Sequence, residues 1–473
     1  MLTLADVIEA LANARPETAT TVITEAAIDS RQVIPGSLFV ALLGERVDGH
    51  DFVADAFRRG ASFALIQHEL PDPLPTLDLR AGFDATALAG LEIPFCLRVD
   101  DSLAAFQQIA HFWRRKLALR VIGITGSVGK STTKEVVAEV LNQRYRTLKS
   151  PGNLNNEIGL PLTILRLGAG YECAVLEMGF YVPGEIAFLC DIALPQVGVV
   201  TNIGTVHAER AGSQEAIARG KTELVEALPP APEGVAILNY DDPWVRPMAE
   251  KTRARVFYYG LDPAADLWAD DVAGLGLEGI RFRLHYRKET LHMRVPMIGQ
   301  HSVHTALRAA AVGLAEGLTW QEIIVGLRQR HTQLRLVAVR SKSGALLLDD
   351  TYNASPESTL AALNLLAELE GRKVAVLGDM LELGSYEKQG HEMVGVRAAE
   401  VAMLLVTVGA RGHMIAAAAR RAGLRSKAIV EFETTDEVIE YLQKHLTGKD
   451  VVLVKGSHGI RMDRIVSTLE AQS

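Results

Sequence analysis

One segment of the chain places glycines, a lysine and hydroxyl side chains in the order that phosphate binding requires. It reads Thr125-Gly126-Ser127-Val128-Gly129-Lys130-Ser131-Thr132. Gly126 and Gly129 allow backbone N–H groups to turn toward an anion, and a helix that begins after them adds positive potential. Lys130 would then reach the β- and γ-phosphates of ATP, and Ser131 would ligate magnesium. We therefore predict that residues 125–132 contact ATP.

This loop departs from the strict pattern G-x-x-x-x-G-K-[ST] at one position, because Ile124 stands where the first glycine belongs. The alternative is a glycine turn followed by an exposed lysine. The flanking sequence favours the phosphate loop, since the apolar run 121–125 is typical of a buried strand. Apolar residues then recur at helical spacing over 136–141.

Two further side chains are metal ligands placed at the ends of predicted strands. Glu177 ends the apolar run 174–176, and His207 follows the run 197–201. The carboxyl ends of parallel strands face one crevice, so both side chains are expected to point at the nucleotide. A carboxylate and an imidazole can hold magnesium there, although imidazole is the less usual ligand. The alternatives are a solvated strand-end charge for Glu177 and a surface or core histidine for His207.

The elements that must position these residues follow an α/β pattern. Strands separated by helical stretches are predicted at 121–125, 174–176, 197–201 and 235–238. This alternation favours a mostly parallel sheet flanked by helices. The same domain is expected to carry a smaller β patch and then an alanine-rich helix, at 257–259, 280–286, 291–295 and 302–316.

A second α/β rhythm begins after residue 330. Its strands are predicted at 345–348, 374–377, 404–408, 429–432 and 451–454, which is typical of a Rossmann-like domain. The first 97 residues mix short apolar runs with turns, and 71–94 reads as a loop-like excursion. We therefore predict three α/β domains: a small substrate domain over 1–97, a P-loop-type ATPase domain over 98–330 and a Rossmann-like domain over 331–473.

The bulk composition is that of a folded globular enzyme. The chain has 473 residues with 48% hydrophobic and 22% charged, which argues against disorder. Its 49 Lys+Arg and 57 Asp+Glu give a net charge of -8, so nucleic acid is a poor partner and a small phosphorylated substrate remains open. Neither a signal peptide nor a membrane span is predicted. The three cysteines lack metal or disulfide spacing, so reduced thiols in a cytoplasm are expected.

Four longer segments carry a resemblance to a known family. They are DSRQVIPGSLFVAL at 29–42, PGNLNNEIGLPLT at 151–163, DDTYNASP at 349–356 and LGDMLELG at 377–384. Together with the phosphate loop they resemble the Mur ligases of bacterial cell-wall synthesis. That family uses the short loop form G-x-x-G-K-[ST], which accounts for Ile124. Within it, the chain is most similar to the branch that adds D-alanyl-D-alanine, since the D-N-P-R element of the preceding ligase is absent.

The resemblance implies a reaction. Such enzymes use ATP to phosphorylate the terminal carboxylate of UDP-N-acetylmuramoyl-tripeptide, and the amine of D-alanyl-D-alanine attacks the acyl phosphate. It also implies two magnesium ions held by Ser131, Glu177 and His207, with Lys130 neutralising charge. Lys221 matches a lysine that relatives carry in carbamoylated form. Without the resemblance, Lys221 reads as a solvated helix residue.

The resemblance extends to further binding residues. Arg335 and Asp350 match ATP contacts across a domain gap. Substrate contacts are implied for Ser30, Arg31, Asn153, Asn155, Asn156, Lys455 and Ser457. Ser30 and Arg31 would hold the UDP end, or they form a polar turn before Pro35.

The sequence also departs from the family at two places. His458 stands where arginine is usual, beside the expected contact to the incoming amine. Ser302 and Thr305 stand where relatives carry asparagines on the adenine side, so we assign no adenine contacts.

Two rival functions are weighed against this one. A related amide ligase with another acceptor, such as a folyl-polyglutamate or diamino-acid ligase, fits the asparagine motif at 153–156 and the N-terminal segment less well. A nucleotide-binding regulator without catalysis is disfavoured, because every expected phosphate and metal position is filled. The sequence leaves open the diamino acid at peptide position three and the oligomeric state, for which a monomer is the simplest expectation.

Overall fold

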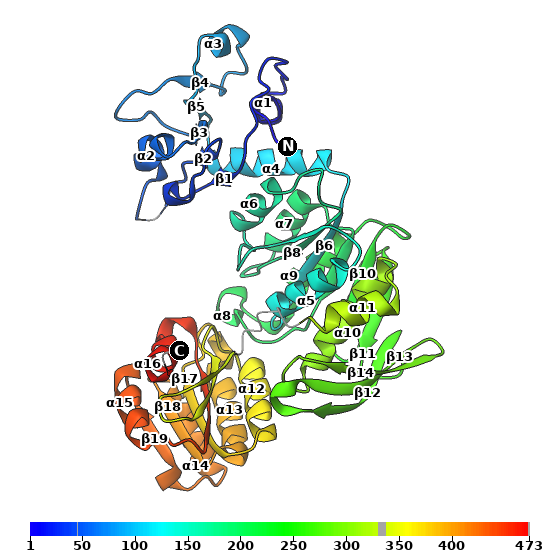
Figure 1. The fold of residues 1–473 in the computed structure, drawn as a ribbon, viewed down its shortest axis with the longest axis vertical. Helices are drawn as coiled ribbons and strands as arrows, with labels where there is room; N and C mark the ends of the chain where they lie inside the picture. The colour runs from blue at the N-terminus through cyan, green and yellow to red at the C-terminus, as the bar shows by residue number, and fades with distance from the viewer. Residues whose placement is uncertain (45, 330–336, 472–473) are drawn as a thin grey trace.

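The computed structural model describes residues 1–44, 46–329 and 337–471. Strands gather in three separate sheets along the chain, of five, nine and six strands. Figure 1 shows the N-terminal sheet at one end of the molecule, the nine-stranded sheet in the middle and the C-terminal sheet at the other end. Each sheet has its own flanking helices, which agrees with the predicted α/β class.

The N-terminal sheet is entirely parallel, with strand order β1-β2-β3-β5-β4. Its strands are β1 (Ala26–Ala27), β2 (Leu38–Val40), β3 (Phe63–Ile66), β4 (Thr76–Asp78) and β5 (Phe95–Arg98). Its helices are α1 (Leu4–Ala12), α2 (Val53–Arg58) and α3 (Ala85–Ala89). The loop predicted over 71–94 is therefore wrong in part. It contains β4, which pairs at the sheet edge, and α3, whose side chains are not buried and so gave no apolar pattern.

The central sheet has the strand order β14-β13-β12-β11-β10-β9-β6-β8-β7. Its first strands are β6 (Arg120–Thr125), β7 (Thr147–Lys149), β8 (Cys173–Glu177), β9 (Val197–Val200) and β10 (Val235–Asn239). The rest are β11 (Arg255–Gly260), β12 (Leu267–Gly274), β13 (Ile280–Tyr286) and β14 (Glu289–Val295). The predicted small β patch is instead a continuation of the main sheet: β11 pairs in parallel with β10, and β12 to β14 extend it.

Helices cover both faces of the central sheet, so its middle strands are buried throughout, as parallel strands require. One face carries α5 (Lys130–Leu141), α10 (Ser302–Ala315) and α11 (Trp320–Leu327). The opposite face carries α7 (Glu185–Ala193) and α9 (Gln214–Glu226), beside α6 (Gly159–Leu165). Helix α4 (Ser102–Lys116) packs on α6 and α7 and also contacts β2 and β3, so it joins the central and N-terminal domains. The short helix α8 (Ala208–Ala211) faces the C-terminal domain, where Glu209 N–H donates to the Glu382 carbonyl.

The C-terminal sheet has the order β15-β16-β20-β17-β18-β19, parallel except for β15. Its strands are β15 (Val337–Arg340), β16 (Leu346–Asp350), β17 (Arg372–Gly378), β18 (Leu404–Val408), β19 (Ile429–Phe432) and β20 (Asp450–Lys455). Its helices are α12 (Pro356–Glu368), α13 (Glu387–Val401), α14 (Gly412–Arg421), α15 (Thr435–His445) and α16 (Asp463–Leu469). The five predicted strands are confirmed, whereas β15 is a short, largely exposed edge strand that was not predicted, although it contains the short apolar run Val337-Ala338-Val339.

All three cysteines lie inside these domains. Cys96, Cys173 and Cys190 are buried and unpaired. Burial raises the pKa of the Cys96 and Cys173 thiols to about 12. Across the described residues, no helix combines the length and apolar character that crossing a membrane requires.

Candidate active site

The phosphate loop connects the carboxyl end of β6 to the start of α5. Gly126 has φ +141, and a Cβ there would lie 1.8 Å from Thr201 Oγ1, so only glycine fits. Gly129 is the N-cap of α5 with φ +85, a left-handed conformation that favours glycine. The first turn of α5 then carries Ser131 and Thr132. The N–H groups of the first turn of a helix have no acceptor within the helix, so this turn can bind an anion.

The loop is held by a side chain that sequence reasoning missed. Asn202, directly after β9, accepts a hydrogen bond from Val128 N–H at 2.9 Å and donates to the Val128 carbonyl at 3.0 Å. Ser127 is fixed in turn, because its hydroxyl accepts from Gly204 N–H at 2.9 Å. The signal available was the position of Asn202 at a strand end beside β6, the same signal that singled out His207.

Lys130 lies at the start of α5. Its ammonium donates to the Gly126 carbonyl at 2.8 Å and to the Ser127 carbonyl at 3.3 Å. The lysine thus folds over the loop it follows. A bound nucleotide would exchange these carbonyl contacts for phosphate oxygens.

The carboxylate of Glu177 is buried at the end of β8, with 1% of the residue exposed. One oxygen accepts from the Asn155 amide at 3.1 Å, whereas Oε2 has no hydrogen-bond partner. The Lys134 ammonium lies 3.7 Å from Oε2. The same ammonium donates a hydrogen bond to the Gly152 carbonyl. A buried carboxylate oxygen without a partner is costly, and a divalent cation would satisfy it. The donor set therefore fits magnesium.

The three predicted asparagines divide by exposure. Asn155 reaches Glu177, and its carbonyl accepts from Gly179 N–H at 2.7 Å. Asn156 is exposed, and its side chain accepts from Gly159 N–H at the start of α6 at 2.9 Å. Asn153 is exposed on the same loop.

His207 joins the central and C-terminal domains. Its φ is +66, and its Nδ1 lies 2.6 Å from Glu382 Oε2, a residue beyond β17. The ring packs edge-on against Tyr181 at 4.9 Å. Burial and the positive charge of Lys130 lower the pKa of His207, although Glu382 opposes the shift. The imidazole is therefore neutral near pH 7, with Nδ1 oriented by Glu382, a partner that sequence reasoning missed.

Lys221 is buried in α9, with 2% of the residue exposed. Its ammonium nitrogen lies 4.5 Å from the centre of the Phe180 ring. Burial, reinforced by the Lys130 charge, lowers the pKa of Lys221 well below its ordinary value. The interpretation of Lys221 as a solvated helix residue is therefore wrong, because α9 turns this position toward the sheet.

A cavity of about 400 Å³ lies between the central and C-terminal domains. Its walls are the phosphate loop, the start of α10, the ends of β16 and β20, and α12. Asp350 and Lys455, which end neighbouring strands, form an ion pair of 2.7 Å in this wall. Glu357, a further contact missed from sequence, accepts from Thr205 N–H at 3.1 Å across the gap. The volume suits a nucleotide.

A second cavity of about 380 Å³ lies on the other side of Lys130. It is lined by Lys130, Asn155, Asn156, Phe180, Tyr181 and His207 among others. Gly129 and Thr132 line the first cavity, so the phosphate loop separates the two spaces. The end of a nucleotide's phosphate chain and a second substrate would therefore meet at Lys130.

The predicted substrate residues Ser457, Ser30 and Arg31 are not among the residues that line these two cavities. Ser457 follows β20, and its hydroxyl accepts from Leu381 N–H at 2.9 Å. Ser30 and Arg31 lie in the N-terminal domain, at the far end of the molecule from the C-terminal sheet (Figure 1). Arg31 is exposed and bonded to Asp29. The predicted ATP contact Arg335 lies outside the described residues.

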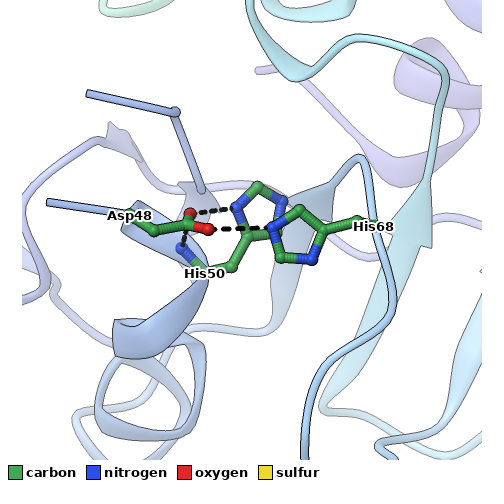
Figure 2. A group of neighbouring side chains, drawn as sticks. All are labelled: Asp48, His50 and His68. Atoms are coloured by element: carbon green, nitrogen blue, oxygen red, sulfur yellow. Dashed lines mark hydrogen bonds and ion pairs between the residues drawn. The ribbon is translucent and has the colours of Figure 1, made fainter. Parts of the chain in front are cut away.

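One further cluster has metal-ligand side chains, shown in Figure 2: Asp48, His50 and His68 of the N-terminal domain. His50 Nδ1 pairs with Asp48 Oδ1 at 2.6 Å, and its Nε2 accepts from Gln67 N–H at 3.0 Å. His68 donates to Asp48 Oδ2 at 2.9 Å and to the Glu69 carbonyl at 2.9 Å. Every ring nitrogen is thus already bonded, and His68 must be the cation because both its nitrogens donate. The cluster therefore links parts of the N-terminal domain, and neither imidazole has a lone pair left for a metal.

Comparison with known proteins accounts for each part of the chain. The Mur ligase middle domain matches residues 124–313, the Mur ligase glutamate ligase domain matches 334–458, and the Mur ligase family catalytic domain matches 22–72. A UDP-N-acetylmuramoyl-tripeptide–D-alanyl-D-alanine ligase of Bacillus subtilis is 35% identical over 96% of this chain and 95% of its own. The chain belongs to the Mur ligase family. A ligase of the same name from Escherichia coli is 34% identical over 93% of this chain and 92% of its own.

Solved structures agree with this Mur ligase assignment. A crystal structure of MurF from Acinetobacter baumannii has a TM-score of 0.83 and 30% identity, covering 98% of each chain. A MurF ligase from Thermotoga maritima in complex with ADP has a TM-score of 0.77 and 29% identity, covering 94% of this chain and 96% of that one. The family and the three-domain α/β Mur ligase architecture predicted from the sequence are therefore confirmed.

Proposed function

We propose that this Mur ligase joins D-alanyl-D-alanine to UDP-N-acetylmuramoyl-tripeptide. ATP becomes ADP and phosphate, and the product is the UDP-N-acetylmuramoyl-pentapeptide precursor of peptidoglycan. The observation that carries the proposal is a pair of cavities on the phosphate loop: one has the size and walls of a nucleotide site, and the other is lined by Lys130. The named relatives supply the identity of the acceptor and the amine.

The first step transfers the γ-phosphoryl group. A carboxylate oxygen of the tripeptide attacks the γ-phosphorus, the bond to the β-phosphate oxygen breaks, and an acyl phosphate and ADP form. Both reactants are anionic, so positive groups must lie between them. Lys130 stands at that position, and the N–H groups of the first turn of α5 face the phosphates.

The second step forms the amide. The amine of D-alanyl-D-alanine attacks the acyl carbon, a tetrahedral intermediate forms, and phosphate leaves with the C–O electron pair. Lys455 and Ser457 lie on the C-terminal domain, where we place the incoming dipeptide. The walls contributed by two domains exclude water, which would otherwise hydrolyse the acyl phosphate.

Magnesium would be held by Ser131, Glu177 and His207. The family pattern implies two magnesium ions. When bound, magnesium neutralises phosphate charge and polarises the transferring group. Glu177 Oε2, which has no hydrogen-bond partner and lies 3.7 Å from the Lys134 ammonium, and the oriented ring of His207 support this assignment.

Lys221 is the residue that we propose to be carbamoylated. Carbamate formation needs a neutral amine to attack carbon dioxide, and the lowered pKa of Lys221 supplies one. The N–C bond forms, the nitrogen releases a proton, and the product carries a carboxylate in place of the amine. A buried carboxylate there would attract the Lys130 cation and supply an oxygen ligand for the second ion.

The domains divide the work. Residues 1–97, with Ser30 and Arg31, would hold the UDP end of the acceptor, and residues 98–330 the ATP and magnesium, with Asn153, Asn155 and Asn156 beside the peptide. Residues 331–473 would close over the site through Asp350, Arg335 and the 455–457 segment. We place the reaction in the cytoplasm, where ATP is available, with no macromolecular partner required.

The proposal is tested by phosphate release from ATP and magnesium with UDP-N-acetylmuramoyl-tripeptide and D-alanyl-D-alanine, omitting each component in turn. We expect release only when both substrates are present, and a pentapeptide product by mass. Acceptors containing lysine or diaminopimelate are tested separately. Turnover with glutamate and none with D-alanyl-D-alanine would reassign the acceptor, and ATP binding without release from any mixture would contradict catalysis.

A further inference from the structure

Arg308 of α10 is a buried arginine in the wall of the nucleotide cavity. The residue is 4% exposed, and it lines the cavity beside Gly129 and Thr132 of the phosphate loop. Among the described residues it forms no ion pair with a carboxylate. A guanidinium cation buried without a counter-charge is costly, so its position needs a physical reason.

The hydrogen bonds of Arg308 leave part of the guanidinium unused. One terminal nitrogen donates to Thr305 Oγ1 at 2.8 Å, and the other lies 3.5 Å from the Tyr259 hydroxyl. Nε is buried and has no hydrogen-bond partner. The fold therefore orients the guanidinium but leaves part of its hydrogen-bond donor capacity unused.

A second buried arginine shows what a structural role looks like here. Arg114 is 3% exposed and likewise forms no ion pair among the described residues. All its nitrogens donate to backbone carbonyls, those of Ala193, Leu117, Leu119 and Leu194. The guanidinium nitrogens of Arg114 therefore all have hydrogen-bond acceptors within the fold, whereas those of Arg308 do not.

The surroundings of Arg308 indicate which group completes it. Its Nη2 would lie 3.4 Å from a Cβ on Gly129, the N-cap of α5. The positive end of that helix and the guanidinium therefore face the same space. Two positive groups brought together at a cavity wall are stable only with an anion between them.

Two neighbouring hydroxyl groups line the same wall of the cavity. Ser302 donates its hydroxyl to the Ile298 carbonyl at 2.7 Å, and the Thr305 hydroxyl accepts from Arg308 at 2.8 Å. Thr305 therefore acts as the support of the arginine, which gives the departure at this position a physical reason.

We propose that Arg308 binds the phosphate chain of ATP at its α-phosphate end, as the counterpart of Lys130 at the γ-phosphate end. The inference rests on the proposed use of ATP and extends it. The guanidinium donates to phosphate oxygens that Thr132 and the start of α5 contact from the other side. It completes its own hydrogen bonding only when the nucleotide is bound.

The test measures dissociation constants of ADP and adenosine by calorimetry, with the full chain and without acceptor or amine. We expect R308M to weaken ADP about 10- to 100-fold and to leave adenosine within about twofold, because charged hydrogen bonds are lost only with phosphate present. R308K keeps the positive charge but not the two-pronged hydrogen-bonding geometry of the guanidinium. It should therefore weaken ADP binding less than R308M does. The matched control R114M should lower the Tm and leave the ratio of ADP to adenosine affinity unchanged.

Three outcomes would overturn the proposal. An equal loss for ADP and adenosine would place the contact on the base or ribose. Unchanged ADP binding by folded R308M would make the residue structural. Should R308M unfold, R308K decides: a loss for ADP alone supports the phosphate contact, and no loss contradicts it. Since no acceptor is present, a wrong acceptor assignment leaves the result unaffected, and a wild-type chain that fails to bind ADP would contradict the proposed function itself.

Discussion

Two regions of this chain contain groups of metal-ligand side chains. They differ in whether the fold itself satisfies the hydrogen-bonding groups of those side chains. In the N-terminal cluster of Asp48, His50 and His68, every ring nitrogen is bonded within the fold. At the carboxyl edge of the central sheet, Glu177 Oε2 has no hydrogen-bond partner, and its ion pair with Lys134 is long, at 3.7 Å. Lys221 is buried nearby with a lowered pKa. Residue types alone therefore do not distinguish a structural cluster from a reaction site. The distinction comes from polar groups that the fold leaves without hydrogen bonds.

The largest effect expected from this contrast comes from Lys130→Ala. Removing the cation at the junction of the two cavities leaves the repulsion between carboxylate and phosphate uncompensated. Phosphate release should fall at least about 10³-fold, with the fold retained by circular dichroism. The control is Lys342→Ala, which removes an ammonium that only bonds the Thr468 carbonyl. Normal turnover by a folded K130A would refute the assignment of the site.

A smaller loss is expected from Lys221→Met, which keeps the apolar stem against Phe180 and removes the amine. Turnover should fall about 10- to 100-fold, because a ligand-supporting group is lost. Formate or acetate should restore part of it by standing in for the carbamate. Full activity of K221M, or a loss that no small carboxylate rescues, would argue against carbamoylation.

Glu177→Gln sharpens the contrast without any measurement of turnover. The variant keeps the shape of the side chain and removes the carboxylate charge whose Oε2 lacks a hydrogen-bond partner. Magnesium should raise the Tm of the wild type, and E177Q should need about 10-fold more magnesium for the same shift. Glu172→Gln, just before the other end of β8, is the control and should respond as the wild type does. An identical magnesium response in E177Q would remove Glu177 from the metal site.

The N-terminal cluster should give the smallest and a purely structural effect. Hydrogen bonds to the Glu69 carbonyl and to Asp48 raise the pKa of His68, so its contribution to stability is present below about pH 6.5 and is lost as the pH rises through the folded value. His68→Gln should therefore lower the Tm by less than about 4 °C, and by more at acid than at alkaline pH.

His50→Gln provides the internal control for that trend. Burial lowers the pKa of His50, so this residue costs stability as the pH falls, and the loss caused by H50Q should shrink at acid pH. Thermal unfolding across the pH range compares both variants. A parallel pH trend in the two variants would contradict the assignment of charge within the cluster.

Sequence reasoning reached the elements whose pattern is local. Glycine spacing predicted the phosphate loop, and apolar runs predicted the strands β6, β8 and β9. The place of Glu177 at a strand end predicted that it faces the site. The edge strand β15 was not predicted, because its apolar run Val337-Ala338-Val339 is too short to distinguish a strand from a loop, and its pairing with β16 shows only in the fold.

Residues that act through contacts distant in sequence were also missed. Glu382 reaches His207 across 175 positions, and Glu357 reaches Thr205 across 152. Arg308 reads in the sequence as one polar residue in an alanine-rich helix. Only the fold shows that its guanidinium faces the phosphate loop. The burial of Lys221 likewise depends on the face that α9 turns to the sheet.

The buried cysteines have a practical consequence for following this enzyme in motion. Maleimide and disulfide reagents attack thiolates, and burial keeps Cys96, Cys173 and Cys190 protonated and out of reach. A cysteine introduced on an exposed face of α12, with another on α7, would therefore take a fluorophore pair in the otherwise native chain. Energy transfer between the two dyes could then time the approach of the domains during a single catalytic cycle.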